Sequence, residues 1–379
     1  MRVLQVNSAR GWGGGEVHCL SLCEELQRAG GEVILACRSN TPLAMRAAQA
    51  GIETLLLPNK NDLDLLSAWR MAQFCRHRQI EIVHAHLVRD YLISYFARQF
   101  GADFRRILTR HVLFPMSASR LNRRMLADAD AVIAVSVAAR DVIVQHPGAH
   151  PERVVIVHNG IRTQEFSNAM PAGWRHEFHI APTASIIGSI GVLLPQKGQY
   201  LLLRALPMVQ TRHPHAAIAL VGDDFSEQAY VAELTQLAIS LGIERSVYFL
   251  GARTNIAGIL REFNLFALPS LSESFSLALV EAMAAGLPVI ASDTGGMREV
   301  VVHRETGILT PPDDPQALAT AICRLLDYPE IAADYGQAGQ QRAAAQFDLS
   351  VMMEKTLAVY RNVLETAPAD GTPNVRIER

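Results

Sequence analysis

Hydrophobic and polar positions along the chain follow two alternating periods. Short apolar runs predict buried strands, and each is followed by a longer segment in which apolar residues recur every three to four positions, as on one face of a helix. The first example is a strand at Arg2–Asn7, a helix at Glu16–Ala29 and a strand at Glu32–Cys37. A strand, a helix and a second strand in this order predict a parallel sheet.

The alternation occurs in two series. The first series continues through strands expected at Thr54–Leu57, Ile82–Ala85, Arg106–Thr109, Ala131–Val135 and Val154–Val157. The periodicity lapses between Arg162 and Thr183, and a second series starts at the expected strand Ile186–Ile190. We therefore predict an α/β protein with two Rossmann-like domains, at residues 1–168 and 183–346. A final helix is expected at residues 347–365 and a disordered tail at residues 366–379.

Composition and charge limit the class of protein. The chain has 379 residues, of which 49% are hydrophobic and 19% charged, as expected of a globular protein with large cores. The net charge is −2, but residues 1–165 carry 20 Lys/Arg and 15 Asp/Glu, which gives +5, and the remainder carries −7. This asymmetry suggests two lobes with different partners, and we expect no nucleic acid among them.

The cysteines and the apolar segments bear on location. The five cysteines show no metal-ligand spacing, so reduced thiols are expected. Met1 leads straight into a strand, and no apolar run approaches the about 18 residues of a membrane span. We expect a cytoplasmic protein, with peripheral contact to the inner face of a membrane as an open alternative.

The most informative stretch is Ser270–Ile290, which reads SLSESFSLALVEAMAAGLPVI. A Ser-rich turn opens an Ala/Leu-rich helix that Ser272 or Ser274 can cap, and Gly286 supplies the stop. The backbone amides of Ser276, Leu277 and Ala278 would then be unpaired at the helix N-terminus, where they and the helix dipole favour a phosphate group.

Two glutamates flank this phosphate cradle. Glu273 is expected in the loop before the helix and Glu281 about two turns inside it. A carboxylate on either side of a phosphate site suits a sugar nucleotide, which offers hydroxyl groups to both. The alternative is an ordinary capped helix with two solvated glutamates.

A second stretch, Gly191–Gly198, reads GVLLPQKG and places Lys197 in a turn that precedes a helix. A lysine there can reach a diphosphate, although a lone turn lysine is more often solvated. Strand ends should display His86, His111, Ser136 and Asn159 along one sheet edge. His111 can serve a transferring sugar or be a hydrogen-bonded structural residue. Asp128 and Asp130 imitate a metal-binding D-x-D motif, but they precede a strand, and no metal is implied.

Taken in order, these motifs resemble the retaining GT-B glycosyltransferases of the glycosyl transferases group 1 family, also called family four. The resemblance spans nearly the whole chain and rests on several short motifs. They are GGGE at residues 13–16, Arg110-His111, Asn159-Gly160-Ile161, Lys197-Gly198, Val221-Gly222, Phe249-Leu250-Gly251, Glu273 with Glu281, Gly286 with Pro288, Gly295-Gly296 and Thr306–Leu309.

The resemblance implies two Rossmann-like lobes with a cleft between them, and a final helix that returns to the first lobe. The C-terminal lobe would bind the nucleotide sugar and the N-terminal lobe the acceptor. Glu281 would hold the ribose, Glu273 the donor sugar and Lys197 the diphosphate, with His111 at the transferring sugar. Further contacts are implied on the donor side for Gly14, Gly15, Gly222, Leu250, Ser276, Leu277 and Ala278, and on the acceptor side for Glu16, His86 and Arg110.

The implied activity is sugar transfer from a nucleoside diphosphate to an acceptor hydroxyl, without a metal or other cofactor. UDP donors are the commonest in the family. The acceptor would be a glycan or a lipid-linked molecule, as in cell-envelope glycan, lipopolysaccharide or glycolipid synthesis. Arginines interleaved with apolar residues from Arg105 to Arg124 suit an anionic membrane surface. The alternative is a solvated face with ordinary loop packing.

The chain departs from the family pattern at two positions. Val192 stands where the family usually has an arginine, and Arg253 and Arg298 are the nearest substitutes by motif context. Ser276 stands where a glycine is frequent, which adds a hydroxyl beside the phosphate site. A GT-B epimerase, a phosphorylase, and a non-catalytic protein that binds sugar nucleotides remain as alternatives.

Overall fold

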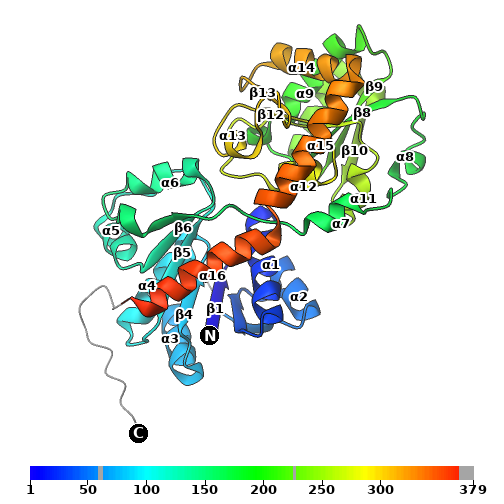
Figure 1. Ribbon diagram of the computed structural model, residues 1–379. Coiled ribbons are helices and arrows are strands. Elements are labelled where there is room, and N and C mark those ends of the chain that lie inside the picture. Colours follow the sequence, from blue (N-terminus) through cyan, green and yellow to red (C-terminus); the bar gives the residue numbers. More distant parts are fainter. Residues whose placement is uncertain (59–62, 225–227, 367–379) are drawn as a thin grey trace. The chain divides into compact units, whose positions relative to one another are not determined.

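The computed structural model describes residues 1–58, 63–224 and 228–366 (Figure 1). The chain forms two compact units. The first contains Met1–Asn159 and the chain from Met352 onward, and the second is Gly160–Val351. The tail expected to be disordered lies outside the described residues, apart from Thr366.

Among its described residues, the first unit has seven parallel strands in the order β3-β2-β1-β4-β5-β6-β7. The strands are β1 Arg2–Asn7, β2 Glu32–Cys37, β3 Glu53–Leu56, β4 Ile82–Ala85, β5 Arg105–Arg110, β6 Ala131–Ala134 and β7 Val154–Ile156. The helices are α1 Gly14–Arg28, α2 Pro42–Gln49, α3 Leu65–Arg78, α4 Val88–Gln99, α5 Arg120–Ala127, α6 Val137–Val144, the 3-10 turn η1 Pro151–Arg153, and α16 Leu349–Glu365, which enters this unit at Met352.

The strand order makes β1 and β4 neighbours at the centre of this sheet, with Val3 paired to Ile82 and Val6 to Ala85. The chain builds β2 and β3 on one side of β1 and then crosses back to build β4 to β7 on the other. The carboxyl ends of β1 and β4 therefore flank a topological switch point, where open α/β sheets bind ligands.

The described part of the second unit contains a sheet of six parallel strands in the order β10-β9-β8-β11-β12-β13, with its own switch point between β8 and β11. The strands are β8 Ser185–Ile190, β9 Ala216–Val221, β10 Val247–Gly251, β11 Leu265–Leu268, β12 Val289–Ser292 and β13 Ile308–Thr310. The helices and 3-10 turns are α7 Thr163–Ser167, α8 Trp174–Glu177, η2 Pro195–Lys197, α9 Gln199–Gln210, α10 Ala229–Ser240, η3 Glu244–Ser246, α11 Ile256–Leu260, α12 Leu277–Ala284, α13 Met297–Val300, α14 Pro315–Asp327 and α15 Pro329–Gln346.

Two glycines allow the loops at this second switch point to pack closely. A Cβ atom on Gly222 would lie 1.9 Å from the carbonyl oxygen of Gly191, and one on Gly198 would lie 2.1 Å from the carbonyl oxygen of Pro269. Both residues also have positive φ, 153° and 70°. The loops after β8, β9 and β11 can therefore approach to backbone contact only with glycine at these positions.

The predicted α/β fold with two Rossmann-like units is confirmed, and the expected strands agree with the observed ones closely. Among the helices and strands, the pattern missed five short elements, α6, α7, α8, α13 and β13. The division of the chain falls at Asn159–Gly160, whereas the lapse in periodicity placed the linker between Arg162 and Thr183. That segment packs on the second unit: Trp174 is buried, and its indole N–H donates to the Ile259 carbonyl at 3.3 Å.

Candidate active site

In the second unit, two loops meet at the switch point between β8 and β11. The backbone N–H of Leu271 donates to the Gln196 carbonyl at 2.8 Å, and the Gln196 side chain donates to the Ser272 carbonyl at 3.2 Å. This cross-link brings the ammonium group of Lys197 into contact with the carboxylate of Glu273. Two residues 76 positions apart, both expected in the donor site, thus form one ion pair.

Helix α12 begins directly after this pair. Its cap is Ser276, whose hydroxyl accepts from the Leu279 N–H at 3.3 Å, so the expectation of Ser272 or Ser274 as the cap was wrong. The helix starts later than expected because the turn extends to Ser276. Within the described ranges, the amides of Ser276, Leu277 and Ala278 donate no hydrogen bond. The expected anion site is therefore open.

Glu281 lies on α12 five residues beyond the cap, a rise of about 7.5 Å, which is nearer to one turn than to the expected two. Its side chain is partly buried, and burial raises the pKa of the carboxyl group from 4.5 to about 7. No described residue forms a hydrogen bond or ion pair with this carboxyl group. A buried acid without a partner is a common mark of a binding site.

The remaining donor-side residues have identifiable packing roles. Gly222 is required by the close approach to Gly191 described above. Leu250 is buried, and its carbonyl accepts from the Arg253 side chain at 2.9 Å. Arg253 pairs with Glu177 at 2.7 Å, and Arg298 pairs with Asp293 at 2.6 Å. Both arginines proposed as substitutes at Val192 therefore already hold carboxylate partners.

In the first unit, the N-terminus of α1 lies beside the end of β1. Gly14 and Gly15 form the first turn of α1, after the cap residue Gly13. Glu16 follows in the same turn and accepts a weak hydrogen bond from the Asn7 side chain at 3.4 Å. Burial raises the pKa of the Glu16 carboxyl group.

His86 and His111 follow β4 and β5, and their ring nitrogens Nδ1 and Nε2 lie 3.2 Å apart. His86 also contacts the Gln5 side-chain oxygen through Nε2 at 2.8 Å, and the Gln5 amide donates to Tyr360 of α16 at 2.9 Å. The Tyr360 hydroxyl lies 2.6 Å from Nδ1 of His84. A chain of buried polar groups thus runs from α16 through the sheet to the site.

Sequence reasoning missed His18, which packs against both site histidines. Its ring centroid lies 5.0 Å from that of His111 and 5.6 Å from that of His86. His18 belongs to the buried stripe of α1 that also contains Cys19, Leu22, Cys23 and Leu26. A histidine within an apolar helical stripe was a signal in the sequence that could have identified it.

Other strand-end residues are buried. Arg110 is 2% exposed and donates to the Phe114 carbonyl, so it is buried in the protein rather than presented to a surface. Ser136 caps α6 by accepting from the Ala139 N–H at 3.0 Å. Asn159 is buried at the division between the units.

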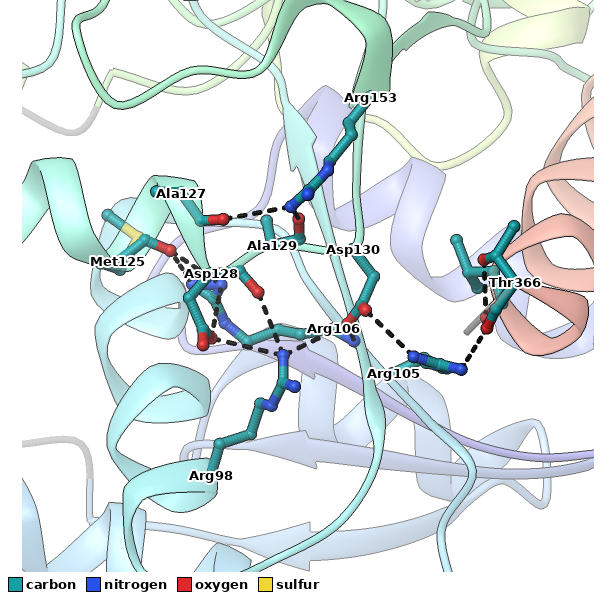
Figure 2. Close-up of polar contacts among 11 residues, drawn as sticks. Arg98, Arg105, Arg106, Met125, Ala127, Asp128, Ala129, Asp130, Arg153 and Thr366 are labelled. Atoms are coloured by element: carbon teal, nitrogen blue, oxygen red, sulfur yellow. Dashed lines mark hydrogen bonds and ion pairs between the residues drawn. The ribbon is translucent and has the colours of Figure 1, made fainter. Parts of the chain in front are cut away.

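The D-x-D sequence belongs to an internal network of arginines (Figure 2). Asp130 lies within ion-pair distance of Arg98 and Arg105, at 3.3 and 3.4 Å, and Asp128 pairs with Arg98 and Arg106. Arg106 is fully buried, and burial lowers the pKa of its guanidinium to about 10. The expected membrane patch was therefore wrong for Arg105, Arg106 and Arg110. Its exposed part is Phe114, which is 62% exposed, with the α5 residues Arg120, Arg123 and Arg124.

Two family models match the chain, one to each unit. The model "Glycosyltransferase Family 4" matches residues 12–165, and the model "Glycosyl transferases group 1" matches residues 173–342. The chain belongs to the glycosyl transferases group 1 family. The resemblance inferred from the motifs is confirmed, and this glycosyltransferase is an enzyme of that family.

Relatives of this glycosyltransferase include D-inositol 3-phosphate glycosyltransferases. The chain is 33% identical to one from Catenulispora acidiphila, over 62% of this chain and 57% of that protein, which is less than two thirds of its length. It is 26% identical to one from Corynebacterium diphtheriae, over 92% of this chain and 89% of that protein.

Solved structures of the same fold include Anabaena HepE in complex with UDP. That structure matches this glycosyltransferase with a TM-score of 0.85 and 26% identity, over 96% of this chain and 100% of that one. A glycosyltransferase from Rickettsia africae has a TM-score of 0.86 at 21% identity, over 97% and 99% of the two chains, which supports the fold alone. The GT-B fold is thereby confirmed. In the described part of the chain, no helix is both long and apolar enough to cross a membrane.

Proposed function

We propose that this glycosyltransferase moves a hexose-type sugar from a UDP-sugar to an acceptor hydroxyl, with retention of the anomeric configuration and without a metal. The observation that carries the proposal is the contact between Lys197 and Glu273 beside the open amides of α12. It places a cation, a carboxylate and an anion-binding helix terminus at one switch point. HepE, a structural relative at 26% identity, was solved with UDP and with UDP-glucose.

The three parts of the donor fit this arrangement in order along α12. The diphosphate would bind the amides of Ser276 to Ala278 and the ammonium of Lys197. Glu273, released from its ion pair with Lys197, would accept hydrogen bonds from the donor sugar. Glu281, about 7.5 Å further along the helix, would accept from the ribose hydroxyls. Leu250 and its neighbours in the loop after β10 would face the base.

Charge develops on the diphosphate as the sugar bond breaks. Lys197 and the helix amides are fixed before the reaction, so they stabilise this charge without reorganising, which is the main source of electrostatic catalysis. In the front-face displacement that we propose, the leaving phosphate takes the proton of the acceptor hydroxyl. The first unit, to which we assign the acceptor, contributes Glu16 and His86. We assign His111 to the transferring sugar, and Gly14 and Gly15 to the phosphate or the acceptor.

The acceptor that we propose is a glycan or lipid-linked hydroxyl of the cell envelope, reached by a cytoplasmic enzyme with peripheral membrane contact. Support comes from the +5 charge of residues 1–165 and from the exposed arginines of α5 beside Phe114. An Arg-rich surface attracts anionic lipid and anionic acceptors alike.

The test has two stages. A thermal-shift panel of UDP, GDP and ADP with their sugars should show a selective rise in melting temperature with uridine ligands, because a ligand that binds the folded state stabilises it. The preferred donor is then incubated with envelope glycans and lipid acceptors in the presence of EDTA, and the product anomer is determined by NMR. An inverted product, or loss of transfer with EDTA, would contradict the mechanism.

A further inference from the structure

The three histidines at the switch point of the first sheet converge on one point. The ring nitrogens of His18, His86 and His111 that could act as ligands lie within 4.8 Å of one another. They come from α1, from the end of β4 and from the end of β5, so the fold brings together side chains that are far apart in sequence. We propose that these histidines form a binding site for one divalent transition-metal ion of the zinc class.

His18 is the first reason. It is 3% exposed, and both of its ring nitrogens lack a hydrogen-bond partner among the described residues. Buried imidazoles in native structures nearly always have a partner, because an unpaired buried polar group loses its hydration without compensation. A metal ion at the centre of the cluster would give His18 the partner that the protein itself does not provide.

The second reason is the distance between the ligand atoms. Imidazole nitrogens bind Zn²⁺ at 2.0–2.1 Å, so two ligands of a tetrahedral site lie about 3.3 Å apart. Nδ1 of His86 and Nε2 of His111 are already 3.2 Å apart. The His18 ring would have to move inward by about 1.5 Å at most, which side-chain rotation can supply. The sharing of one ion would replace the contact between His86 and His111.

Outer contacts orient the His86 ring in the way that metal sites require. Its Nε2 faces the Gln5 side-chain oxygen at 2.8 Å, and Gln5 in turn is held by Tyr360. Because an amide oxygen only accepts, Nε2 carries the proton, and the lone pair of Nδ1 points into the cluster. A ligating histidine typically donates its other N–H to such an acceptor.

The cluster is also accessible from one side. His111 is partly exposed, which provides the access route and leaves the fourth position for water.

The ion class follows from the ligands. Three imidazoles with an open fourth position suit Zn²⁺ and other late transition metals, whereas Mg²⁺ and Ca²⁺ prefer oxygen ligands. This ion is not needed for transfer. Since it would engage His111, which the proposed function assigns to the transferring sugar, it should inhibit the enzyme, and this consequence rests on that proposed function.

The experiment measures metal binding directly. The full chain, freed of metal by chelator treatment, is titrated with Zn²⁺ against a competing chromophoric chelator, and with Co²⁺ for its tetrahedral visible absorption. We expect one ion per chain. His18→Gln should weaken binding by more than 100-fold, and Gln5→Leu by about 10–100-fold, the usual cost of losing an outer partner. His176→Gln, at an exposed histidine, is the matched control and should bind as wild type.

Each outcome either supports the three-histidine site or overturns it. Absence of 1:1 binding in wild type, or equal affinity of wild type and His18→Gln, would overturn the proposal. Loss of binding in His176→Gln would show a surface site instead. If His18→Gln does not fold, Gln5→Leu and anomalous scattering from a Zn²⁺-soaked crystal decide, since the ion must lie on all three rings. Binding without inhibition of transfer would contradict only the assignment of His111 in the proposed function.

Discussion

Removal of the partly buried carboxyl group of Glu281 should stabilise the second unit. Raising the pKa of this acid from 4.5 to about 7 corresponds to about 3.4 kcal/mol of free energy, at about 1.36 kcal/mol per pH unit. The part of the side chain that remains exposed reduces this to about 2 kcal/mol. In the function that we propose, this unpaired carboxylate would bind the ribose hydroxyls, which would offset the cost when a donor is bound.

The direction of the pH dependence follows from linkage. Between pH 4.5 and 7 the folded state binds the Glu281 proton more tightly than the unfolded state does, so stability falls as the pH rises. The cost is absent below pH 4.5 and complete above pH 7. Glu281→Gln should therefore raise the free energy of unfolding by about 2 kcal/mol at pH 8 and by only about 0.8 kcal/mol at pH 5.

The assay must report on the second unit alone, because two units need not unfold together. Trp174 is buried in that unit, and replacing Trp12 and Trp69 by Phe leaves it as the single fluorescent reporter. Urea unfolding of this background is compared with and without Glu281→Gln at both pH values. Glu233→Gln, at an exposed position of α10, is the matched control.

The affinity for the nucleotide should depend on pH in the opposite direction to the stability. Ribose hydroxyls favour the ionised carboxylate, so the affinity for a UDP-sugar should increase from pH 6 to pH 8. UDP-sugar is the better probe because it lacks the terminal phosphate that titrates near pH 6. Glu281→Gln or Glu281→Ala should weaken binding by about 1.5–3 kcal/mol and remove the pH dependence. A variant that is no more stable at pH 8, and that binds as tightly as Glu233→Gln, would refute both the burial cost and the ribose contact.

Four further predictions concern the donor site and the surface. Glu273→Ala should spare the affinity for UDP but impair use of the UDP-sugar; equal loss of UDP affinity in the Glu273 and Glu281 variants would contradict this division of roles. Lys197→Ala should lower the single-turnover rate by about 10²–10³-fold, and a rate within a few-fold of wild type would make it an ordinary turn lysine. Val192→Arg should raise that rate, because Arg253 and Arg298 are already paired; an unchanged rate would show that the position has no access to the diphosphate. Flotation with anionic vesicles should fall with salt and by about 100-fold when the three exposed arginines of α5 become glutamine, at about 1 kcal/mol each; binding equal to that on neutral vesicles would exclude the membrane contact.

Periodicity predicted the elements well because buried parallel strands leave a strong apolar signal. The strands β1, β2 and β4 match the expected ranges, since their residues are nearly all buried on both faces. The elements α7, α8, α13 and β13 were missed because helices of four or five residues and a strand of three residues show too little periodicity to recognise. The eight-residue helix α6 was also missed. The linker was misplaced because Pro171 and Gly173 resemble loop signals. The burial of Trp174 depends on tertiary packing, which the local sequence does not reveal.

Some features of the candidate site were likewise predictable from the sequence and others were not. Glu273, Glu281 and Lys197 were identified because local turn and cap signals place them near a helix terminus. The burial of Arg105, Arg106 and Arg110 was not predictable, because each depends on partners distant in sequence, such as the Met125 carbonyl that accepts from Arg106 at 2.8 Å. A run of arginines is therefore ambiguous between a surface patch and an internal network until its aspartates are placed.

The ion pair of Lys197 and Glu273 explains how two opposite charges can lie side by side in the site before a donor binds. In the free enzyme each group neutralises the other, so neither is left uncompensated in a partly buried position. In the donor complex that we propose, the diphosphate would replace Glu273 as the partner of Lys197, and the sugar hydroxyls would replace Lys197 as the partner of Glu273. The donor would then bind by exchange of partners, and a nucleotide without its sugar would leave Glu273 with solvent alone. This difference would favour retention of the intact donor over the spent nucleotide, which is the order that turnover requires.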